Sequence, residues 1–345
     1  MSGGEVLFLG VEGTRLSRAE ARILARVRPA GVVLVQRNID DEAGLRELVA
    51  ELRAARPGLL LALDAEGGRV DRLRGLVGPA PGADRLARCP PALARRAGYW
   101  VGAALAGFGF DLDLAPVADL DHGRAGNALD RRTFGGDPRR VASRAGAFLD
   151  GLHAAGVGAC LKHFPGLGDA GTDTHLAPAA IALDARALAR DLAPFAALGG
   201  RAEAVMAGHA AYPALDPQAR PATLSPALCT SLLRRRLRFR GALLSDDLEM
   251  GALAPWGELA ERGGEALAAG CDGLLFCRRI EAAPEIAARL ASRALAARRA
   301  EAEVRLARLR RALARRRAEA GPPPALARVR SALARLSVRV PAEPA

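Results

Sequence analysis

The feature of this sequence that most limits its fold is a series of eight short apolar runs, each ending in polar residues. Continuous apolar runs of this length are typical of strands buried on both faces, as in a parallel sheet. Helix-like stretches such as Leu16–Val27 and Asp41–Ala55 separate most of them. The runs are Glu5–Gly13, Ala30–Asn38, Leu59–Gly68, Phe110–Asp119, Gly156–Gly166, Ala202–Ala210, Gly241–Met250 and Cys271–Arg279.

This alternation predicts an α/β fold, namely a single (β/α)8 barrel of the TIM type; a doubly wound parallel sheet is the alternative. In a barrel the carboxyl ends of all strands meet at one mouth, where functional residues are found. We therefore expect the polar residues that follow the runs to surround one site. They are Gln36–Asn38, Asp64, Asp119, Lys162–His163, His209 and Ser245–Asp247.

The end of the chain predicts a helical extension of the barrel. Leu306, Leu309 and Leu313 follow helical spacing, and the glycine and prolines of Gly321–Pro324 end that helix. A short helix over Ala325–Leu336 follows. We assign residues 1–320 to the barrel with its last helix, and residues 321–345 to a proline-containing linker and helical tail.

The net charge of +12 does not predict a nucleic-acid partner, because of where it lies. From Arg289 onward there are 15 arginines and 4 glutamates, a net +11 that leaves only +1 for the rest of the chain. This favours an arginine-rich helix face in solvent, with contact to an anionic surface as the alternative.

The N-terminal apolar run is short and lacks basic residues, so we expect no signal peptide, no membrane span and a cytoplasmic protein. The five scattered cysteines predict free thiols and no zinc site.

Two segments carry residues that can do chemistry. The first holds Lys162, the only lysine among 50 basic residues, followed by His163 and a glycine-rich loop that we expect to be mobile. The loop ends in Asp173 and His175, which can form a general acid/base pair, although an exposed polar loop explains them equally well. The second segment is Leu243–Ala252, which has a carboxylate at the end of its apolar run. A carboxylate at this position can be a nucleophile, a base, a metal ligand or a helix cap.

The combination of these groups indicates a glycosidase. Lys162, His163, Arg72 and Arg132 offer donors, and Asp64 offers an acceptor, for several sugar hydroxyls. A nucleophilic carboxylate and a proton donor complete the requirements for hydrolysis of a glycosidic bond.

Five ordered motifs also resemble those of bacterial NagZ-type β-N-acetylglucosaminidases of glycoside hydrolase family 3. KHFPGLGDAGTDTH resembles the signature KHFPGHGD…DSH, and LDAEGGRVDRL resembles DQEGGRVxR. RTFGGDP resembles RSFGxDP, MAGHAAYPALDP resembles MTAHVxYPxxDP, and LLSDDLEMGA resembles FSDDLxM. Two positions depart from the signature, because Leu167 replaces its second histidine and Thr174 its serine. The first departure puts the geometry of the loop and the leaving-group preference in question.

The resemblance implies a role for each matching residue. Asp246 would be the nucleophile that forms a covalent glycosyl-enzyme intermediate, and His175 the acid/base assisted by Asp173. The substrate would be a small carbohydrate with a terminal β-linked N-acetylglucosamine, a muropeptide fragment of peptidoglycan recycling or a chitooligosaccharide. The resemblance implies no metal and no organic cofactor, and we expect a monomer. The implied sugar-binding residues are Asp64, Arg72, Arg132, Lys162 and His163, and Met206 and His209 are candidates for substrate contact.

Other functions remain open on the sequence. A relative acting on β-glucosides or β-xylosides is the first, although many of those carry S-D-W at the nucleophile and a further C-terminal domain, where this chain has Ser245-Asp246-Asp247. A non-catalytic sugar-binding or surface-binding protein is the second. A mononuclear metal hydrolase is disfavoured, because no H-x-H follows the first run and the chain has only five histidines.

Overall fold

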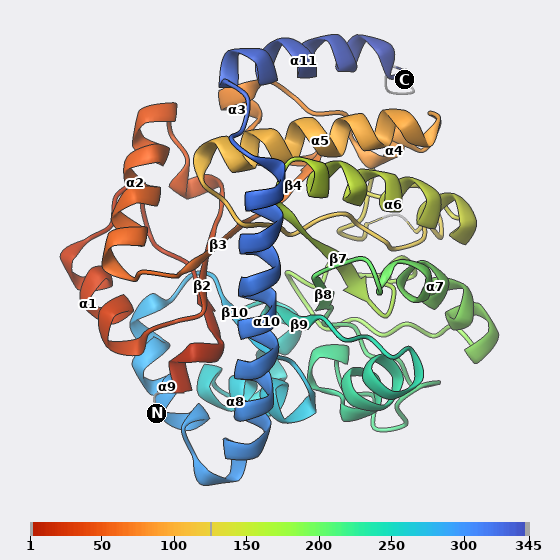
Figure 1. Cartoon of the computed structure of the whole chain (residues 1–345). Helices are drawn as coiled ribbons and strands as arrows, with labels where there is room; N and C mark the ends of the chain where they lie inside the picture. Colours follow the sequence, from red (N-terminus) through yellow and green to blue (C-terminus); the bar gives the residue numbers. More distant parts are fainter. Residues whose placement is uncertain (1–2, 125, 342–345) are drawn as a thin grey trace.

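The computed structural model describes residues 3–124 and 126–341, and its centre is a closed barrel of eight parallel strands (Figure 1). The first strand pairs with both the second and the last, so the sheet has no free edge. This confirms the predicted (β/α)8 barrel and excludes the doubly wound sheet. The barrel strands, in chain order, are β1 (Leu7–Leu9), β2 (Gly31–Leu34), β3 (Leu60–Leu63), β6 (Leu112–Asp113), β7 (Gly158–Phe164), β8 (Ala204–Ala207), β9 (Ala242–Asp247) and β10 (Gly273–Phe276).

The fourth barrel strand, β6, is much shorter than the apolar run that predicted it. It ends at Asp113, although the apolar run continues to Asp119. Pro116 lacks the N–H that a central strand must donate to its neighbour. Beyond it, only an isolated bridge between Val117 and Lys162 continues the pairing with β7.

Helices cover the outside of the barrel, and their starts follow local sequence signals. Ser17 and Glu20 form a capping box at the start of α1, and the side chain of Asp41 accepts the N–H of Gly44 at the start of α2. A π-helical segment, Ala227–Arg236, follows β8. The α-helices are α1 (Arg18–Val27), α2 (Glu42–Ala55), α3 (Arg74–Val77), α4 (Ala83–Leu86), α5 (Pro91–Phe108), α6 (Pro138–Ala154), α7 (Ala185–Leu198), α8 (Leu259–Ala269), α9 (Ala283–Leu290), α10 (Ala296–Ala320) and α11 (Leu326–Arg339).

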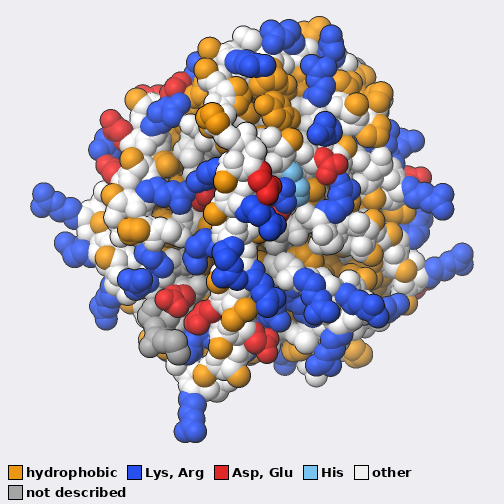
Figure 2. Space-filling view, viewed as in Figure 1, with side chains coloured by type: hydrophobic (Ala, Val, Ile, Leu, Met, Phe, Trp, Pro, Cys, Tyr) orange, Lys and Arg blue, Asp and Glu red, His pale blue; other side chains and the backbone are white. Residues whose placement is uncertain are grey.

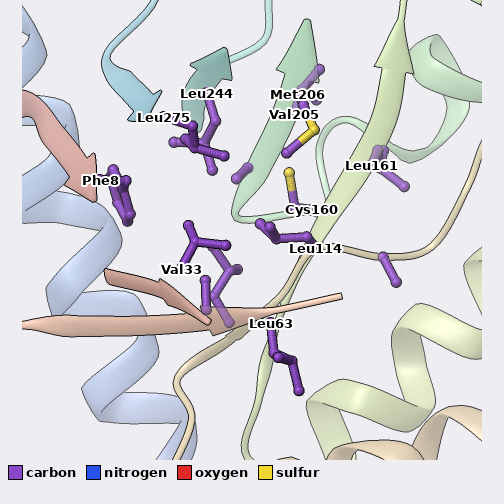
Figure 3. Close-up of a cluster of buried hydrophobic side chains, with 14 of the residues drawn as sticks. Phe8, Val33, Leu63, Leu114, Cys160, Leu161, Val205, Met206, Leu244 and Leu275 are labelled. Carbon is purple, nitrogen blue, oxygen red and sulfur yellow. The ribbon is translucent and has the colours of Figure 1, made fainter. Parts of the chain in front are cut away.

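The barrel is filled by side chains and is not an open channel. Figure 3 shows Phe8, Val33, Cys160, Leu244 and Leu275 converging from different strands in the space that the strands enclose. All five are buried. The packed interior closes the barrel beneath its mouth and leaves no room there for a ligand, and in this fold sites lie at the carboxyl ends of the strands.

The helix α10 crosses the opposite end of the barrel, where the strands begin (Figure 1). Buried carboxylates stand one residue before β6, β8 and β10, and arginines of α10 bind all three. Arg317 lies 2.5 Å from Asp111, Arg316 binds Glu203, and Arg305 lies 3.0 Å from Asp272. The expectation of a helix face simply solvated by water is therefore wrong for these arginines, which neutralise buried acids.

Each of these carboxylates also fixes the neighbouring strand. Asp111 accepts the N–H of Leu61 in β3, Glu203 that of Ala159 in β7, and Asp272 that of Leu243 in β9. The basic residues left on this face produce the dense cover of positive side chains in Figure 2. All of them are arginines, because the single lysine is buried.

The last helix, α11, packs against α5 and α3 at one side of the barrel (Figure 1). Its buried residues, Val329, Leu333 and Leu336 among them, follow helical spacing. A short hairpin, β4 (Ala65–Gly67) and β5 (Val70–Asp71), follows β3 at the mouth. Within the described ranges, no helix has the length and apolar character needed to cross a membrane.

Candidate active site

A cavity of about 300 Å³ opens at the carboxyl ends of the strands, as the barrel predicts. The strands β3, β7, β8 and β9 bring most of the candidate residues to it. Two further candidates, Asp173 and His209, do not line the cavity and instead contact residues next to it. The predicted residues that line it are Asp64, Arg72, Arg132, Lys162, His163, His175, Met206 and Asp246.

Lys162 is the centre of a buried ion-pair network on one wall of the cavity. Its Nζ lies 2.5 Å from Asp64 Oδ1 and 2.7 Å from Glu66 Oε1. Glu66 also accepts two bonds from Arg132, from Nη2 at 2.7 Å and from Nε at 2.9 Å. The sequence motif contained Glu66, but sequence reasoning did not give it a role. Two cations and two carboxylates thus hold one another in fixed positions.

The charges of this network compensate one another despite burial. Burial alone would lower the pKa of Lys162, but the carboxylates of Asp64 and Glu66 outweigh that effect and raise it. Burial would raise the pKa of Glu66, but the charges of Arg132 and Lys162 hold it well below its usual range. Asp113 lies beneath the network, and burial raises its pKa well above the usual value. This direction favours the protonated form of Asp113, and the network itself pairs two cations with two carboxylates.

His163 is oriented by Asp119, a buried residue to which sequence reasoning gave no specific role. Asp119 Oδ2 lies 2.7 Å from His163 Nδ1, and the same carboxylate accepts the backbone N–H of His163. It also accepts the N–H of Leu167 at 2.8 Å. This arrangement leaves His163 Nε2 to face the cavity and anchors the start of the following loop.

Asp246 and its neighbour Asp247 have different surroundings at the end of β9. Burial opposes ionisation of Asp246, but the charges of His209 and His163 and the N–H of Asp247 lower its pKa. Burial raises the pKa of Asp247 to about 6. Its Oδ1 accepts the N–H of Glu249 and of Cys277, so it fixes the turn after the strand.

His209, a candidate for substrate contact, lies behind the cavity wall. It is fully buried, its Nε2 lies 2.9 Å from the carbonyl oxygen of Asp247, and its Nδ1 lies 2.8 Å from Thr223 Oγ1. These bonds fix the backbone beside Asp246, so the residue positions the nucleophile candidate. Met206, the other candidate, does line the cavity.

The loop that carries His175 has a buried first half and an exposed second half. Its start, Pro165–Ala170, is buried, and Leu167 fills an apolar position there. The side chain of His175 is 51 % exposed. Asp173 Oδ1 lies 2.7 Å from His175 Nδ1 and accepts the backbone N–H of the same histidine. This is the hydrogen bond that the D-x-H spacing predicted.

The exposed half of the loop rests on the segment after β9. Gly251 donates its N–H to the carbonyl oxygen of His175, and Ala252 donates to that of Thr174. The side chain of His175 reaches the same cavity as Asp246. With Nδ1 bound to Asp173, the proton that His175 can exchange with a ligand is on Nε2.

Arg72 completes the cavity wall from the hairpin β4–β5. Its Nε is buried and, within the described part of the chain, has no hydrogen-bond partner. A buried donor without a partner is costly, and a ligand oxygen would satisfy it. Among the described residues, no group of histidine, cysteine, aspartate and glutamate side chains is arranged to hold a metal ion.

One cavity at the mouth of the barrel thus contains an ionised carboxylate and a histidine with one free nitrogen. Paired hydrogen-bond donors and acceptors line the same cavity. Hydrolysis of a glycosidic bond requires this division of roles, and the barrel is therefore that of a glycosidase.

Comparison with known families specifies the class further. The Glycosyl hydrolase family 3 N terminal domain matches residues 3–311, most of the chain, and the chain belongs to this family. A beta-hexosaminidase of Pseudomonas aeruginosa is 44 % identical over 277 residues, which cover 79 % of this chain and 82 % of that protein. A beta-hexosaminidase of Methylococcus capsulatus is 38 % identical over 299 residues, 81 % of this chain and 85 % of that protein.

Solved structures agree with this membership. A NagZ from Neisseria gonorrhoeae, in complex with N-trifluoroacetyl-D-glucosamine, superposes with a TM-score of 0.77 at 29 % identity, covering 97 % of this chain and 98 % of that one. A beta-N-acetylhexosaminidase from Beutenbergia cavernae gives 0.82 at 30 % identity, over 89 % of this chain and 97 % of that one. The motif resemblance to family 3 is thus confirmed.

Proposed function

We propose that this protein is a retaining exo-β-N-acetylglucosaminidase, with Asp246 as nucleophile and the pair Asp173–His175 as acid/base. The observation that carries the proposal is that Asp246 and His175 face the same cavity, with the pKa of Asp246 lowered and His175 Nδ1 bound to Asp173. The relatives named beta-hexosaminidase support the choice of sugar.

The first step forms a covalent glycosyl-enzyme. Asp246 attacks the anomeric carbon while the bond to the leaving oxygen breaks, and His175 Nε2 gives its proton to that oxygen. Asp173 accepts the hydrogen bond of His175 Nδ1 and stabilises the positive charge while the imidazole is protonated. In the second step His175 takes a proton from water, whose oxygen attacks the anomeric carbon and releases Asp246. The product keeps the β configuration.

The network on the opposite wall binds the hydroxyls of the sugar ring. Asp64, Lys162 and Arg132 hold one another at fixed distances before a ligand enters, so little order has to be created on binding. Among the residues that the structure describes, Arg72 Nε is buried without a partner and can bind a ligand oxygen, and His163 presents Nε2. This is the set that the family resemblance implied.

The use of histidine as the proton carrier follows from where the loop lies. A carboxylic acid needs an apolar, buried site to remain protonated near neutral pH. The side chain of His175 is half exposed, so the loop offers no such site, and an imidazole held by Asp173 carries the proton instead.

We further propose that the substrates are muropeptide fragments of peptidoglycan recycling, that the enzyme acts as a monomer, and that it works in the cytoplasm. A chitooligosaccharide is the alternative natural substrate, and β-glucosides or β-xylosides are the alternative glycosides. A panel of 4-nitrophenyl glycosides separates these sugars, and a preference for glucoside over N-acetylglucosaminide would reverse the choice.

The test of the mechanism traps the intermediate. The protein is incubated with a fluorinated, slowly hydrolysed aryl N-acetylglucosaminide, and its peptides are analysed by mass spectrometry. We expect a sugar adduct on the peptide that contains Asp246, and no adduct and no turnover with Asp246→Asn. The matched control is Asp247→Asn, which must still form the adduct on Asp246. Normal turnover by Asp246→Asn would refute the nucleophile assignment.

A further inference from the structure

Behind Asp246, the side chain of Thr223 forms a hydrogen bond to which no role has yet been given. Thr223 lies in the short 3₁₀ helix Ala222–Leu224 after β8 and is fully buried. Its Oγ1 lies 2.8 Å from Nδ1 of His209, whose Nε2 lies 2.9 Å from the carbonyl oxygen of Asp247. Asp247 in turn donates its backbone N–H to Oδ1 of Asp246 at 2.8 Å. Thr223 is thus connected to the nucleophile candidate through His209 and the backbone of Asp247.

The two partners of His209 allow only one neutral form of its imidazole. A carbonyl oxygen can only accept a hydrogen bond, so Nε2 must carry a proton toward Asp247. In a neutral imidazole Nδ1 is then an acceptor, and the hydroxyl of Thr223 must donate to it. The other neutral form would place the lone pair of Nε2 against those of the carbonyl oxygen. Thr223 therefore determines which ring nitrogen holds the proton.

A different arrangement of these protons requires a charged His209. The Thr223 hydroxyl also lies 2.7 Å from the carbonyl oxygen of Gly208 and 3.1 Å from that of Ala207. Because a hydroxyl has one proton, a bond to Gly208 would require Nδ1 to carry a proton of its own and donate it to Oγ1. Burial opposes this and lowers the pKa of His209, although the charge of Asp246 opposes the shift. The imidazole is therefore neutral near pH 7 and acquires its charge only in the acidic range, where Asp246 also titrates.

The backbone around Thr223 is held without its hydroxyl. Thr223 donates its backbone N–H to the carbonyl oxygen of Gly208. Two residues further on, Ser225 donates its hydroxyl to the buried Asp216 at 2.6 Å. These bonds place Oγ1 of Thr223 beside the imidazole, and they remain when the hydroxyl is removed. We therefore expect variants at this position to fold.

We propose that Thr223 is a positioning residue for the glycosidase reaction and acts through His209 on Asp246. This rests on the proposed function, because it takes Asp246 as the nucleophile. By donating to Nδ1, Thr223 keeps the imidazole proton on Nε2, and that proton holds the carbonyl of Asp247 at the end of β9. Thr223 lies behind the cavity wall and not along it, so it contributes to the placement of the carboxylate and not to bond formation.

The first test replaces Thr223 with residues that keep or remove its hydroxyl. Thr223→Val puts a methyl group where Oγ1 lies 2.8 Å from Nδ1 of His209, whereas a carbon atom needs about 3.5 Å, so the imidazole must move. The kcat on 4-nitrophenyl N-acetyl-β-glucosaminide, per active site counted by the trapped adduct, should fall about tenfold. KM should stay within about twofold, because the sugar-binding residues are untouched. Thr223→Ser keeps the hydroxyl and should recover most of kcat.

Two further measurements show whether the effect passes through His209. In a His209→Gln background, Thr223→Val should lower kcat by no more than about twofold further, because the group on which Thr223 acts is gone. The nitrogen NMR shifts of wild-type His209, one of five histidines in the chain, should show a proton on Nε2 and none on Nδ1 near pH 7. The matched control is Thr230→Val, which removes a hydroxyl bonded to the carbonyl oxygen of Ala269 at 2.8 Å and should leave kcat unchanged.

The outcomes separate this inference from the proposed function. A wild-type kcat in Thr223→Val, or losses that multiply in the double variant, would overturn the inference. A proton on Nδ1 of wild-type His209 near pH 7 would overturn it as well. If the wild-type protein releases no nitrophenol, or carries the trapped sugar on a residue other than Asp246, the proposed function fails and this inference with it.

Discussion

The replacement Lys162→Arg keeps the charge and changes only the shape of the side chain, so it tests the network that Lys162 organises. The lysine is 2 % exposed, and its Nζ fills the space between Asp64 Oδ1 at 2.5 Å and Glu66 Oε1 at 2.7 Å. Both oxygens of Glu66 already accept bonds from Arg132. A planar guanidinium can enter only by displacing Asp64 or Arg132.

The expected magnitudes follow from this crowding. Overpacking a filled interior costs about 1–3 kcal/mol of unfolding free energy, which leaves a protein of ordinary stability folded. A displacement of about 1 Å at substrate-positioning groups can lower activity by about a hundredfold. We therefore expect Lys162→Arg to be folded and to lose most of its kcat/KM.

The assay measures kcat/KM on 4-nitrophenyl N-acetyl-β-glucosaminide together with urea unfolding of the same preparation. Lys162→Met is the companion variant, because it removes the charge and leaves the half-buried Asp64 without its cation and the buried Glu66 with Arg132 alone, and breaking such a pair costs about 3–5 kcal/mol. The expected order of stability is wild type, Lys162→Arg, Lys162→Met. A Lys162→Arg protein within about twofold of wild-type kcat/KM would refute the reasoning.

Three further predictions concern separate parts of the molecule. Asp272→Ala removes the partner of three arginines at the start of β10, and it should lower the unfolding free energy in urea by about 3–5 kcal/mol. The control, Glu319→Ala, breaks an exposed pair and should cost under about 0.5 kcal/mol. Equal losses in the two variants would contradict the role of the buried acid. Burial raises the pKa of Asp71 to about 6, so the folded state holds a proton that the unfolded chain releases near pH 4. Unfolding free energy should therefore fall by about 2 kcal/mol as pH rises from 4 to 6. Asp71→Asn should remove that part of the fall in a comparison of the two proteins at both pH values, and an identical pH dependence would rule the residue out. His175→Ala should lower hydrolysis of a natural disaccharide by about 10²- to 10⁴-fold and that of 4-nitrophenyl glycosides much less, because nitrophenolate leaves with little help from an acid; equal losses on both substrates would argue against a proton-donor role.

The sequence predicted the barrel well because a buried parallel strand can be recognised from its own residues. Its apolar run is visible without reference to any other segment, and the polar residue near its end, such as Asp64 or His163, indicates which end of the strand lies at the mouth. The hydrogen bond between Asp173 and His175 was predictable for the same reason, since both groups lie in one short loop.

Partners that are distant in the sequence were not predictable in this way. Glu66 became visible as a partner of Lys162 and Arg132 only when β3, β7 and the segment after β6 were brought together. Asp119 and His209 likewise act on residues more than thirty positions away. The sequence predicted solvated arginines on α10, because their partner carboxylates lie in three distant segments, at Asp111, Glu203 and Asp272.

The helix α10 also constrains when this chain can complete its fold during synthesis. Its arginines bind acids at the starts of the fourth, sixth and eighth barrel strands, which span more than 160 residues, and α10 is made after all of them. Before residues 296–320 leave the ribosome, Asp111 lacks Arg317, Glu203 lacks Arg316 and Asp272 lacks Arg305. A nascent barrel therefore pairs these acids only in part, through Arg53, His153 and Arg234, and each acid gains its last cationic partner when α10 arrives.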